Sequence, residues 1–171
     1  MPFTIVRQDL FRMDVDALVC AANTSLQSGG GVCGTIFKAA GTEQLQEACY
    51  HLAPIQIGEA VITPGFNLKA KYVIHTAGPV YRGGNNGEAR LLRLSYLNSL
   101  RLAIENHCSS IAFPLISSGL YRYPKREALQ VASDAIQGFL KEYDLDVYLA
   151  VYDRDAFTIS EKLLGEVASY L

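Results

Sequence analysis

Two glycine- and serine-rich stretches carry the clearest chemical signal in this sequence. Residues 28–34 read SGGGVCG and residues 116–124 read ISSGLYRYP. Each stretch precedes an expected helix, where successive backbone N–H groups and the helix dipole together favour an anion. Parallel strands end at one edge of a sheet, so two such loops at that edge predict a diphosphate held between them.

Gly29, Gly31 and Gly34 also match the GxGxxG pattern of dinucleotide-binding proteins. That motif needs a tight turn between strand and helix, whereas residues 23–28 separate the expected strand from the first glycine here. The acidic residue that binds ribose should end the next strand, but Glu59 begins it. The glycines therefore predict a phosphate loop, and the spacing disfavours an NAD-dependent oxidoreductase.

The elements that must position these loops alternate along the chain. We expect strands at residues 4–7, 17–21, 59–63, 72–76, 110–115 and 147–152, and helices at 35–50 (with a break at Gly41), 88–107, 124–143 and 155–171. This alternation predicts a three-layer α/β/α domain with a largely parallel sheet. The strands at 59–63 and 72–76 are too close for a helical crossover, so they should form a hairpin and make the sheet mixed.

The composition predicts one globular domain over residues 1–171. Half of the residues are hydrophobic and the formal net charge is -2, which gives no sign of a nucleic-acid surface. No leader or membrane-spanning run is visible, so we expect a cytoplasmic monomer. Cys20, Cys33, Cys49 and Cys108 lack the spacing of a redox or zinc motif, and we expect four reduced thiols and no metal.

Three segments resemble the macrodomain family, in its MacroD-like branch, by their order and spacing. They are DVDALVCAANTSLQSGGGVCGTIFKAAG, YVIHTAGPVY and IAFPLISSGLYRYP. The resemblance implies a six-stranded mixed sheet and a cleft for ADP-ribose, free or attached to a protein. It also implies hydrolysis of ADP-ribose from modified proteins or deacetylation of O-acetyl-ADP-ribose. The alternative, a reader module that binds without turnover, stays open.

The same resemblance assigns roles to individual residues and implies no cofactor. Asp9 and the backbone of Leu10 would bind the adenine, and Tyr152 would pack against it. Asn23 and Tyr121 would fix the distal ribose and are the expected catalytic residues. The diphosphate would be bound by Gly30, Gly31, Val32 and Cys33 of the first loop and by Ser117, Ser118, Gly119, Leu120 and Tyr121 of the second.

The sequence departs from the family pattern at four positions. Cys33 replaces the loop aspartate that is assigned a role in activating water, Cys20 replaces an asparagine, and Arg122 and Gln8 each replace a glycine. A thiol with an unperturbed pKa of about 8.5 is a poor general base at neutral pH. We therefore expect Cys33 to shape the loop and, at a helix N-terminus, to be the most reactive thiol. His75 is expected in the core.

Overall fold

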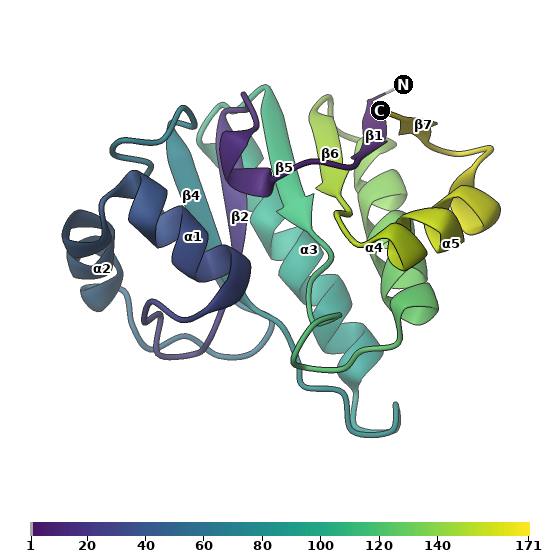
Figure 1. The fold of residues 1–171 in the computed structure, drawn as a ribbon, viewed down its shortest axis with the longest axis horizontal. Helices are drawn as coiled ribbons and strands as arrows, with labels where there is room; N and C mark the ends of the chain where they lie inside the picture. Colours follow the sequence, from purple (N-terminus) through teal and green to yellow (C-terminus); the bar gives the residue numbers. More distant parts are fainter. Residues whose placement is uncertain (1) are drawn as a thin grey trace.

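The computed structural model describes residues 2–171, and its centre is a seven-stranded sheet with the order β3-β4-β2-β5-β6-β1-β7 (Figure 1). The strands are β1 (Phe3–Val6), β2 (Ala17–Ala22), β3 (Ala60–Pro64), β4 (Tyr72–Ala77), β5 (Ser110–Pro114), β6 (Asp146–Ala150) and β7 (Ser169–Tyr170). The helices are a 3-10 turn η1 (Leu10–Arg12), α1 (Gly31–Ala40), α2 (Thr42–Tyr50), α3 (Glu88–Glu105), α4 (Lys125–Leu140) and α5 (Arg154–Leu164). The fold is the predicted α/β type.

Among the strands of residues 2–171, one pair of neighbours is antiparallel. β3 and β4 form a hairpin in which Val61 pairs with His75, and every other pairing in the sheet is parallel. The predicted hairpin and the mixed sheet are therefore confirmed. The parallel strands β2, β5 and β6 end at the same edge, which is where the two glycine- and serine-rich loops begin.

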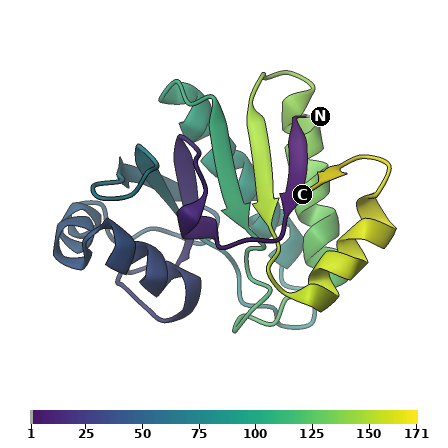
Figure 2. The ribbon, with the colours of Figure 1, turned by 45° about the horizontal axis from the view of Figure 1, so that its top comes forward.

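Side chains alternate across the sheet and divide the core in two. On β2, Ala17 and Val19 face the cluster that includes α3 and α4, whereas Leu18 and Cys20 face the cluster that includes α1 and α2. Figure 1 shows α1 and α2 in front of the sheet and α3 and α4 behind it. Figure 2 shows α5 near α4 at the β1 side of the sheet. The three predicted layers follow from this alternation.

The C-terminal helix and the strand count differ from the prediction. The helix expected at 155–171 ends at Leu164, and Ser169–Tyr170 adds a seventh strand where six were expected. Leu171 N–H donates to the Ile5 carbonyl at 2.9 Å, so the segment after the helix supplies backbone partners to β1. The unpaired edge of β1 explains why this segment leaves the helix, because exposed backbone groups at a strand edge seek partners.

The helix expected at 35–50 breaks at Gly41 as predicted, with φ 111°, and it begins earlier, at Gly31. The glycine loop therefore runs directly into the first turn of α1.

No helix within residues 2–171 is long and apolar enough to cross a membrane.

Candidate functional site

A cavity of about 680 Å³ opens at the carboxyl edge of the sheet. Its floor is formed where three strands end, at Ala22 of β2, Pro114 of β5 and Ala150 of β6. Eleven of the thirteen predicted site residues line it: Asn23, Gly30, Gly31, Val32, Cys33, Ser117, Ser118, Gly119, Leu120, Tyr121 and Tyr152. The structure thus brings both loops to a single hollow, as the strand order requires.

One wall is the first loop (residues 23–33), which ends in the first turn of α1. The N–H groups of Gly31, Val32 and Cys33 donate no hydrogen bond within residues 2–171, and no side chain caps the helix at Gly30. A Cβ added at Gly34 would overlap the Gly29 carbonyl, so the loop can fold this tightly only onto a glycine. The result is a helix start with free donors on the cavity, where a negative charge is stabilised.

Asn23 organises the beginning of this loop. Its Oδ1 accepts hydrogen bonds from Ser25 Oγ at 2.8 Å and from the Gln27 N–H at 3.1 Å, while Nδ2 donates to the Gln27 carbonyl at 3.4 Å. Gln46 of α2 braces the loop further on by accepting from the Ser28 N–H at 2.7 Å. The Asn23 side chain is therefore held in one orientation, and its second amide N–H is left for a ligand.

The first loop is also closed by a disulfide between Cys20 and Cys33, whose Cα atoms lie 5.5 Å apart. The prediction of four reduced thiols is therefore wrong for this pair, and only Cys49 and Cys108, both buried, are free. The expectation that Cys33 is the most reactive thiol fails for the same reason. The two cysteines are 13 residues apart and match no local motif. Their sulfur atoms meet because the Cys20 side chain points from the sheet toward α1, which carries Cys33.

The opposite wall is the second loop (residues 115–123), which lies between β5 and α4. The N–H groups of Gly119, Leu120 and Tyr121 donate no hydrogen bond within residues 2–171. Ser117 and Arg122 adopt left-handed backbone conformations, with φ 67° and 61°. At Arg122 this conformation favours glycine, the residue that the resemblance implies at this position, since a side chain is disfavoured there.

Tyr96 of α3 fixes the start of the second loop from below. Its hydroxyl donates to the Pro114 carbonyl at 3.2 Å and accepts from the Ile116 N–H at 3.0 Å. The ring is fully buried, and burial raises the pKa of the hydroxyl well above its usual range. A further hydrogen bond, from the Tyr123 N–H to the Ser117 carbonyl at 2.9 Å, closes the loop on itself.

The segment before α3 braces the second loop from outside. The Tyr81 N–H donates to the Tyr121 carbonyl at 2.9 Å. Glu88 holds that segment, because its carboxylate accepts from the N–H groups of Arg82, Gly84 and Asn86 at 2.6 to 3.0 Å. These backbone donors lower the pKa of Glu88 to about 2, and the N–H group of Arg82 makes the largest contribution.

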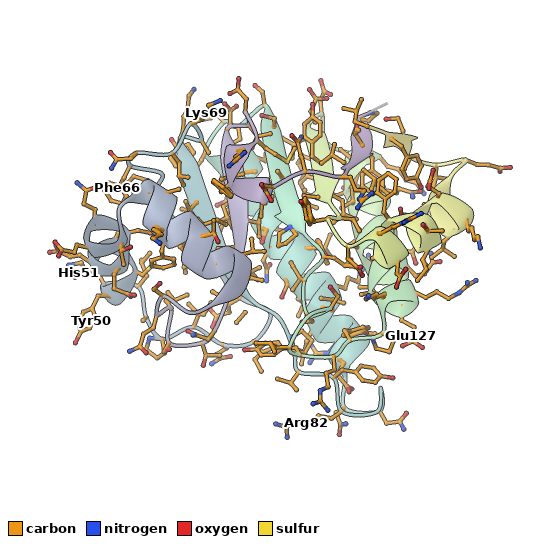
Figure 3. All side chains as sticks on the ribbon, in the orientation of Figure 1. Tyr50, His51, Phe66, Lys69, Arg82 and Glu127 are labelled. Atoms are coloured by element: carbon orange, nitrogen blue, oxygen red, sulfur yellow. A yellow bond between two sulfur atoms is a disulfide. The ribbon has the colours of Figure 1, made fainter. Side chains whose placement is uncertain are left out.

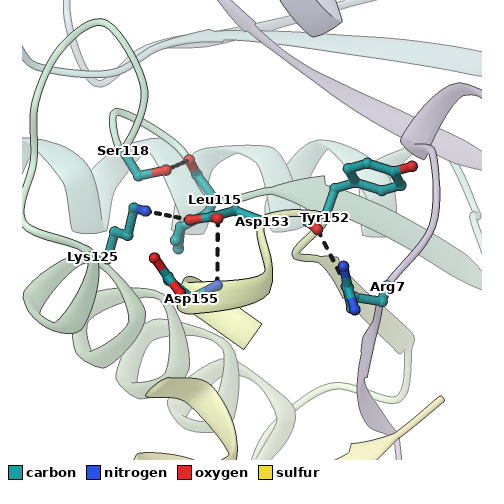
Figure 4. A network of polar contacts seen from close by, with 7 residues as sticks. All are labelled: Arg7, Leu115, Ser118, Lys125, Tyr152, Asp153 and Asp155. Carbon is teal, nitrogen blue, oxygen red and sulfur yellow. Dashed lines mark hydrogen bonds and ion pairs between the residues drawn. The ribbon is translucent and has the colours of Figure 1, made fainter. Parts of the chain in front are cut away.

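An ion pair stands on the rim of the cavity (Figure 4). Lys125 at the start of α4 donates to Asp153, and Asp153 in turn accepts from the Asp155 N–H at the start of α5. This contact raises the pKa of Lys125 and lowers that of Asp153. The sequence did not assign Lys125 to the site. Because the two charges are paired, most of the positive potential available to an anion comes from the backbone N–H groups.

The residues expected at the adenine end are only partly in the cavity. Tyr152 lines it and is 66% exposed, and its carbonyl accepts a hydrogen bond from Arg7 Nε at 3.3 Å (Figure 4). Asp9, paired with Arg12 at 3.9 Å, and the buried Leu10 lie outside the lining. Since β1 and β6 are parallel neighbours, Asp9 and Tyr152 follow strands that end at the same edge.

His75 is a core residue, as predicted. It is fully buried, and its Nε2 lies 3.0 Å from Thr63 Oγ1 and 3.7 Å from the Cys49 sulfur. Burial lowers the pKa of His75 to about 4, so the ring is neutral at physiological pH. The described part of the chain also contains no group of three or more His, Cys, Asp or Glu side chains that could hold a metal.

A second hollow, of about 490 Å³, lies on the outer side of α2. It is lined by Thr42, Glu43, Gln46, Glu47, Tyr50 and His51. Figure 3 shows Tyr50 and His51 at the outer edge of the molecule, away from Glu127 at the start of α4. All of these lining residues belong to α2 or its end, and no loop of residues 2–171 with free backbone donors lines this hollow, so the cavity at the sheet edge is the candidate site.

Comparisons with known proteins identify the family of the chain. The Macro domain family model matches residues 19–132. A Macro domain-containing protein of Chlorobaculum tepidum is 48% identical over 153 residues, which are 88% of this chain and 88% of that protein. An O-acetyl-ADP-ribose deacetylase of Salmonella typhimurium is 46% identical over 168 residues, covering 95% of this chain and 93% of the relative.

Solved structures give the same result. A mutant macrodomain of Oceanobacillus iheyensis with ADPR superposes with a TM-score of 0.89 at 36% identity, covering 94% of this chain and 90% of the other. The family match spans most of the chain, and the relatives are well above 30% identical over nearly their whole length. The chain belongs to the Macro domain family.

Proposed function

We propose that this protein binds ADP-ribose in the cavity at the sheet edge and hydrolyses the acetyl ester of O-acetyl-ADP-ribose. The observation that carries the proposal is the pair of facing loops with free backbone donors. Three N–H groups at Gly31, Val32 and Cys33 and three at Gly119, Leu120 and Tyr121 have no acceptor within residues 2–171. Two such groups of donors suit the two phosphates of a diphosphate.

The orientation of the ligand follows from what flanks the two loops. Tyr152 offers an exposed ring at one end of the cavity, near the ends of β1 and β6, and this end would take the adenine. Asp9 and Leu10 would contact the outer edge of that base. Asn23 and Tyr121 lie with the two loops and would hold the distal ribose. The solved neighbour with ADPR and the deacetylase relative support ADP-ribose as the ligand class.

The chemistry we propose is positioning of the ester and of a water molecule. Water would add to the acetyl carbonyl, the ester C–O bond would break, and acetate and ADP-ribose would leave. The Cys33 sulfur is covalently bonded to Cys20, so in this state it can act neither as a base nor as a nucleophile. Lys125 and Asp153 neutralise each other on the rim. Rate enhancement would therefore come from geometry and from backbone donors.

Calorimetry with ADP-ribose and with NAD, followed by an assay for acetate released from O-acetyl-ADP-ribose, tests the proposal. We expect tight binding of ADP-ribose, weaker binding of NAD and measurable release of acetate. Asn23→Ala should lower the rate of release, whereas the matched control Asn67→Ala, on the exposed turn between β3 and β4, should not. Failure of ADP-ribose to bind would refute the proposal.

A second candidate function is a reader that binds ADP-ribose on modified proteins without turnover. The observation that favours it is the replacement of the usual loop carboxylate by a disulfide-bonded Cys33. Leu120, 97% exposed on the rim, and the exposed Tyr152 leave the cavity open to a protein-attached ligand. Binding of ADP-ribose without any release of acetate would select the reader.

A further inference from the structure

We propose that Cys20 and Cys33 form a reversible redox modification site in the wall of the cavity, and that its state sets the affinity for ADP-ribose. The proposal rests on the binding function proposed above. Its basis is the placement of the pair: one sulfur comes from the sheet and the other from the first turn of α1, inside the loop that presents free N–H groups.

The two sulfurs differ in how they can be reached. Cys20 is 0% exposed and packs within the cluster between the sheet and α1. Cys33 is half-buried and lines the cavity. A small thiol or peroxide entering the cavity therefore meets the Cys33 sulfur first, and Cys20 acts as the internal partner that completes each reaction.

A dithiol is sufficient to reduce the disulfide, and hydrogen peroxide is sufficient to form it again. In reduction, a dithiol's thiolate attacks Cys33 Sγ, the Cys20 thiolate leaves and takes up a proton, and the second thiol then displaces Cys33 to form the reductant's own disulfide. In oxidation, the Cys33 thiolate attacks hydrogen peroxide and breaks its O–O bond, so that the sulfur becomes a sulfenic acid and the released hydroxide takes up a proton to form water. The Cys20 thiol then attacks that sulfur and expels water.

The disulfide couples to the ligand through the loop that it closes. Its two ends are 13 residues apart, and the chain between them carries Asn23 and the glycines that precede α1. Fixing both ends of this segment holds the free N–H groups of Gly31, Val32 and Cys33 in place before a ligand arrives. A loop that is already ordered loses less entropy on binding, so the oxidised protein should bind ADP-ribose more tightly.

The coupling is reciprocal. If the disulfide favours the ligand, the ligand must favour the disulfide by the same factor. The other two cysteines cannot replace this pair, because Cys49 and Cys108 are buried away from the cavity and burial raises the pKa of both thiols, that of Cys49 to about 11.

The experiment uses the unmodified protein in two states, so no variant has to fold. Calorimetry with ADP-ribose is run on the oxidised protein and after reduction by dithiothreitol, and intact-mass measurement after thiol labelling counts two or four free thiols. We expect reduction to weaken binding roughly threefold to tenfold. In buffers of reduced and oxidised dithiothreitol, saturating ADP-ribose should shift the Cys20–Cys33 equilibrium toward the disulfide by the same factor.

Matched variants assign the effect to this pair. Cys49→Ala and Cys108→Ala should keep the redox response, whereas a Cys20→Ala, Cys33→Ala double variant should lose it. Equal affinity in both states, or four free thiols that oxidised dithiothreitol cannot pair, would overturn the proposal. If ADP-ribose binds neither state, the proposed function is refuted and the coupling with it, while the thiol count still decides whether the pair is a redox site.

Discussion

The two loops that face each other across the cavity both present free backbone donors but are stabilised by different means. The first loop ends in three glycines at the start of α1 and is tied to β2 by a covalent bond between Cys20 and Cys33. The second loop contains no disulfide and is held by hydrogen bonds, including those of Tyr96 beneath it. It also keeps Ser117 and Arg122 in left-handed conformations.

This difference shows which changes would disturb the conformation of each loop. Besides the hydrogen bonds of Asn23 and Gln46, the first loop depends on the absence of side chains at its glycines and on one disulfide, whose chemistry responds to redox conditions. The second depends on buried polar contacts, which are costly to leave unpaired and respond to no thiol reagent. Variants that act on one loop and leave the other unchanged therefore test the two modes of stabilisation independently.

The largest effect on ligand affinity should come from Gly34→Ala in the first loop. The added Cβ would overlap the Gly29 carbonyl, which is backbone and cannot move aside without shifting the loop. We expect calorimetry to show a loss of ADP-ribose affinity of more than about tenfold, equivalent to about 1.4 kcal/mol. Gly138→Ala is the control, because the space around that glycine is empty. Unchanged affinity in Gly34→Ala would mean that the first loop is not a binding wall.

Acid should destabilise the fold by protonating the buried His75. This residue pairs in register with Cys20, so it lies in the part of the sheet to which the first loop is tied. The folded pKa of His75 is about 4 and its unfolded value is 6.5. The unfolded chain therefore binds the proton first, and stability falls from pH 6.5 to pH 4 by an amount on the order of 2–3 kcal/mol.

Urea unfolding at pH 7.5, 5.5 and 4.5 measures this loss. His75→Gln should be less stable at pH 7.5 but should show a flatter profile over this window. Glu88 acts in a different range: its depressed pKa of about 2 contributes stability that is present above pH 4.5 and is lost as the pH falls toward 2. A wild-type profile that is flat between pH 6.5 and 4.5 would contradict the role given to His75.

Tyr96→Phe should loosen the second loop. The change removes one hydroxyl and leaves the Ile116 N–H and the Pro114 carbonyl without their partner, at a cost of about 1–3 kcal/mol in the free energy of unfolding. Affinity for ADP-ribose should fall as well, while the redox response of the first loop should remain. Tyr143→Phe, at an exposed position, is the matched control. Equal stability of the two variants would remove Tyr96 from this role.

The smallest effect should come from Arg122→Gly. The exposed arginine sits at φ 61°, which a glycine adopts without steric cost. We expect a gain of up to about 1 kcal/mol in thermal or urea unfolding, partly offset by the greater freedom of glycine in the unfolded chain. A clear loss of stability would show that the arginine side chain makes a stabilising contact in solution.

Sequence reasoning found the loops because strand ends and glycine patterns are local signals. It placed the second loop and the break at Gly41 well, since both follow from short-range backbone chemistry. It missed Lys125 and the Cys20–Cys33 bond, because these contacts depend on how α4 meets α5 and how α1 packs on β2. It also predicted too long a last helix. The helical spacing of apolar residues carries no information about the unpaired backbone groups at the edge of β1, which residues 169–170 pair with instead.

The position of β1 has a consequence for how the protein is made. The described partners of β1 are β6 and β7, and Phe3 pairs with Val147 near the other end of the chain. On the ribosome, the N-terminal strand must wait unpaired until most of the polypeptide has been synthesised, and contacts this distant in sequence form slowly. Asp9 and Leu10 follow β1 directly, so the segment that we propose to contact the adenine takes its place late, after both loops already have their strands.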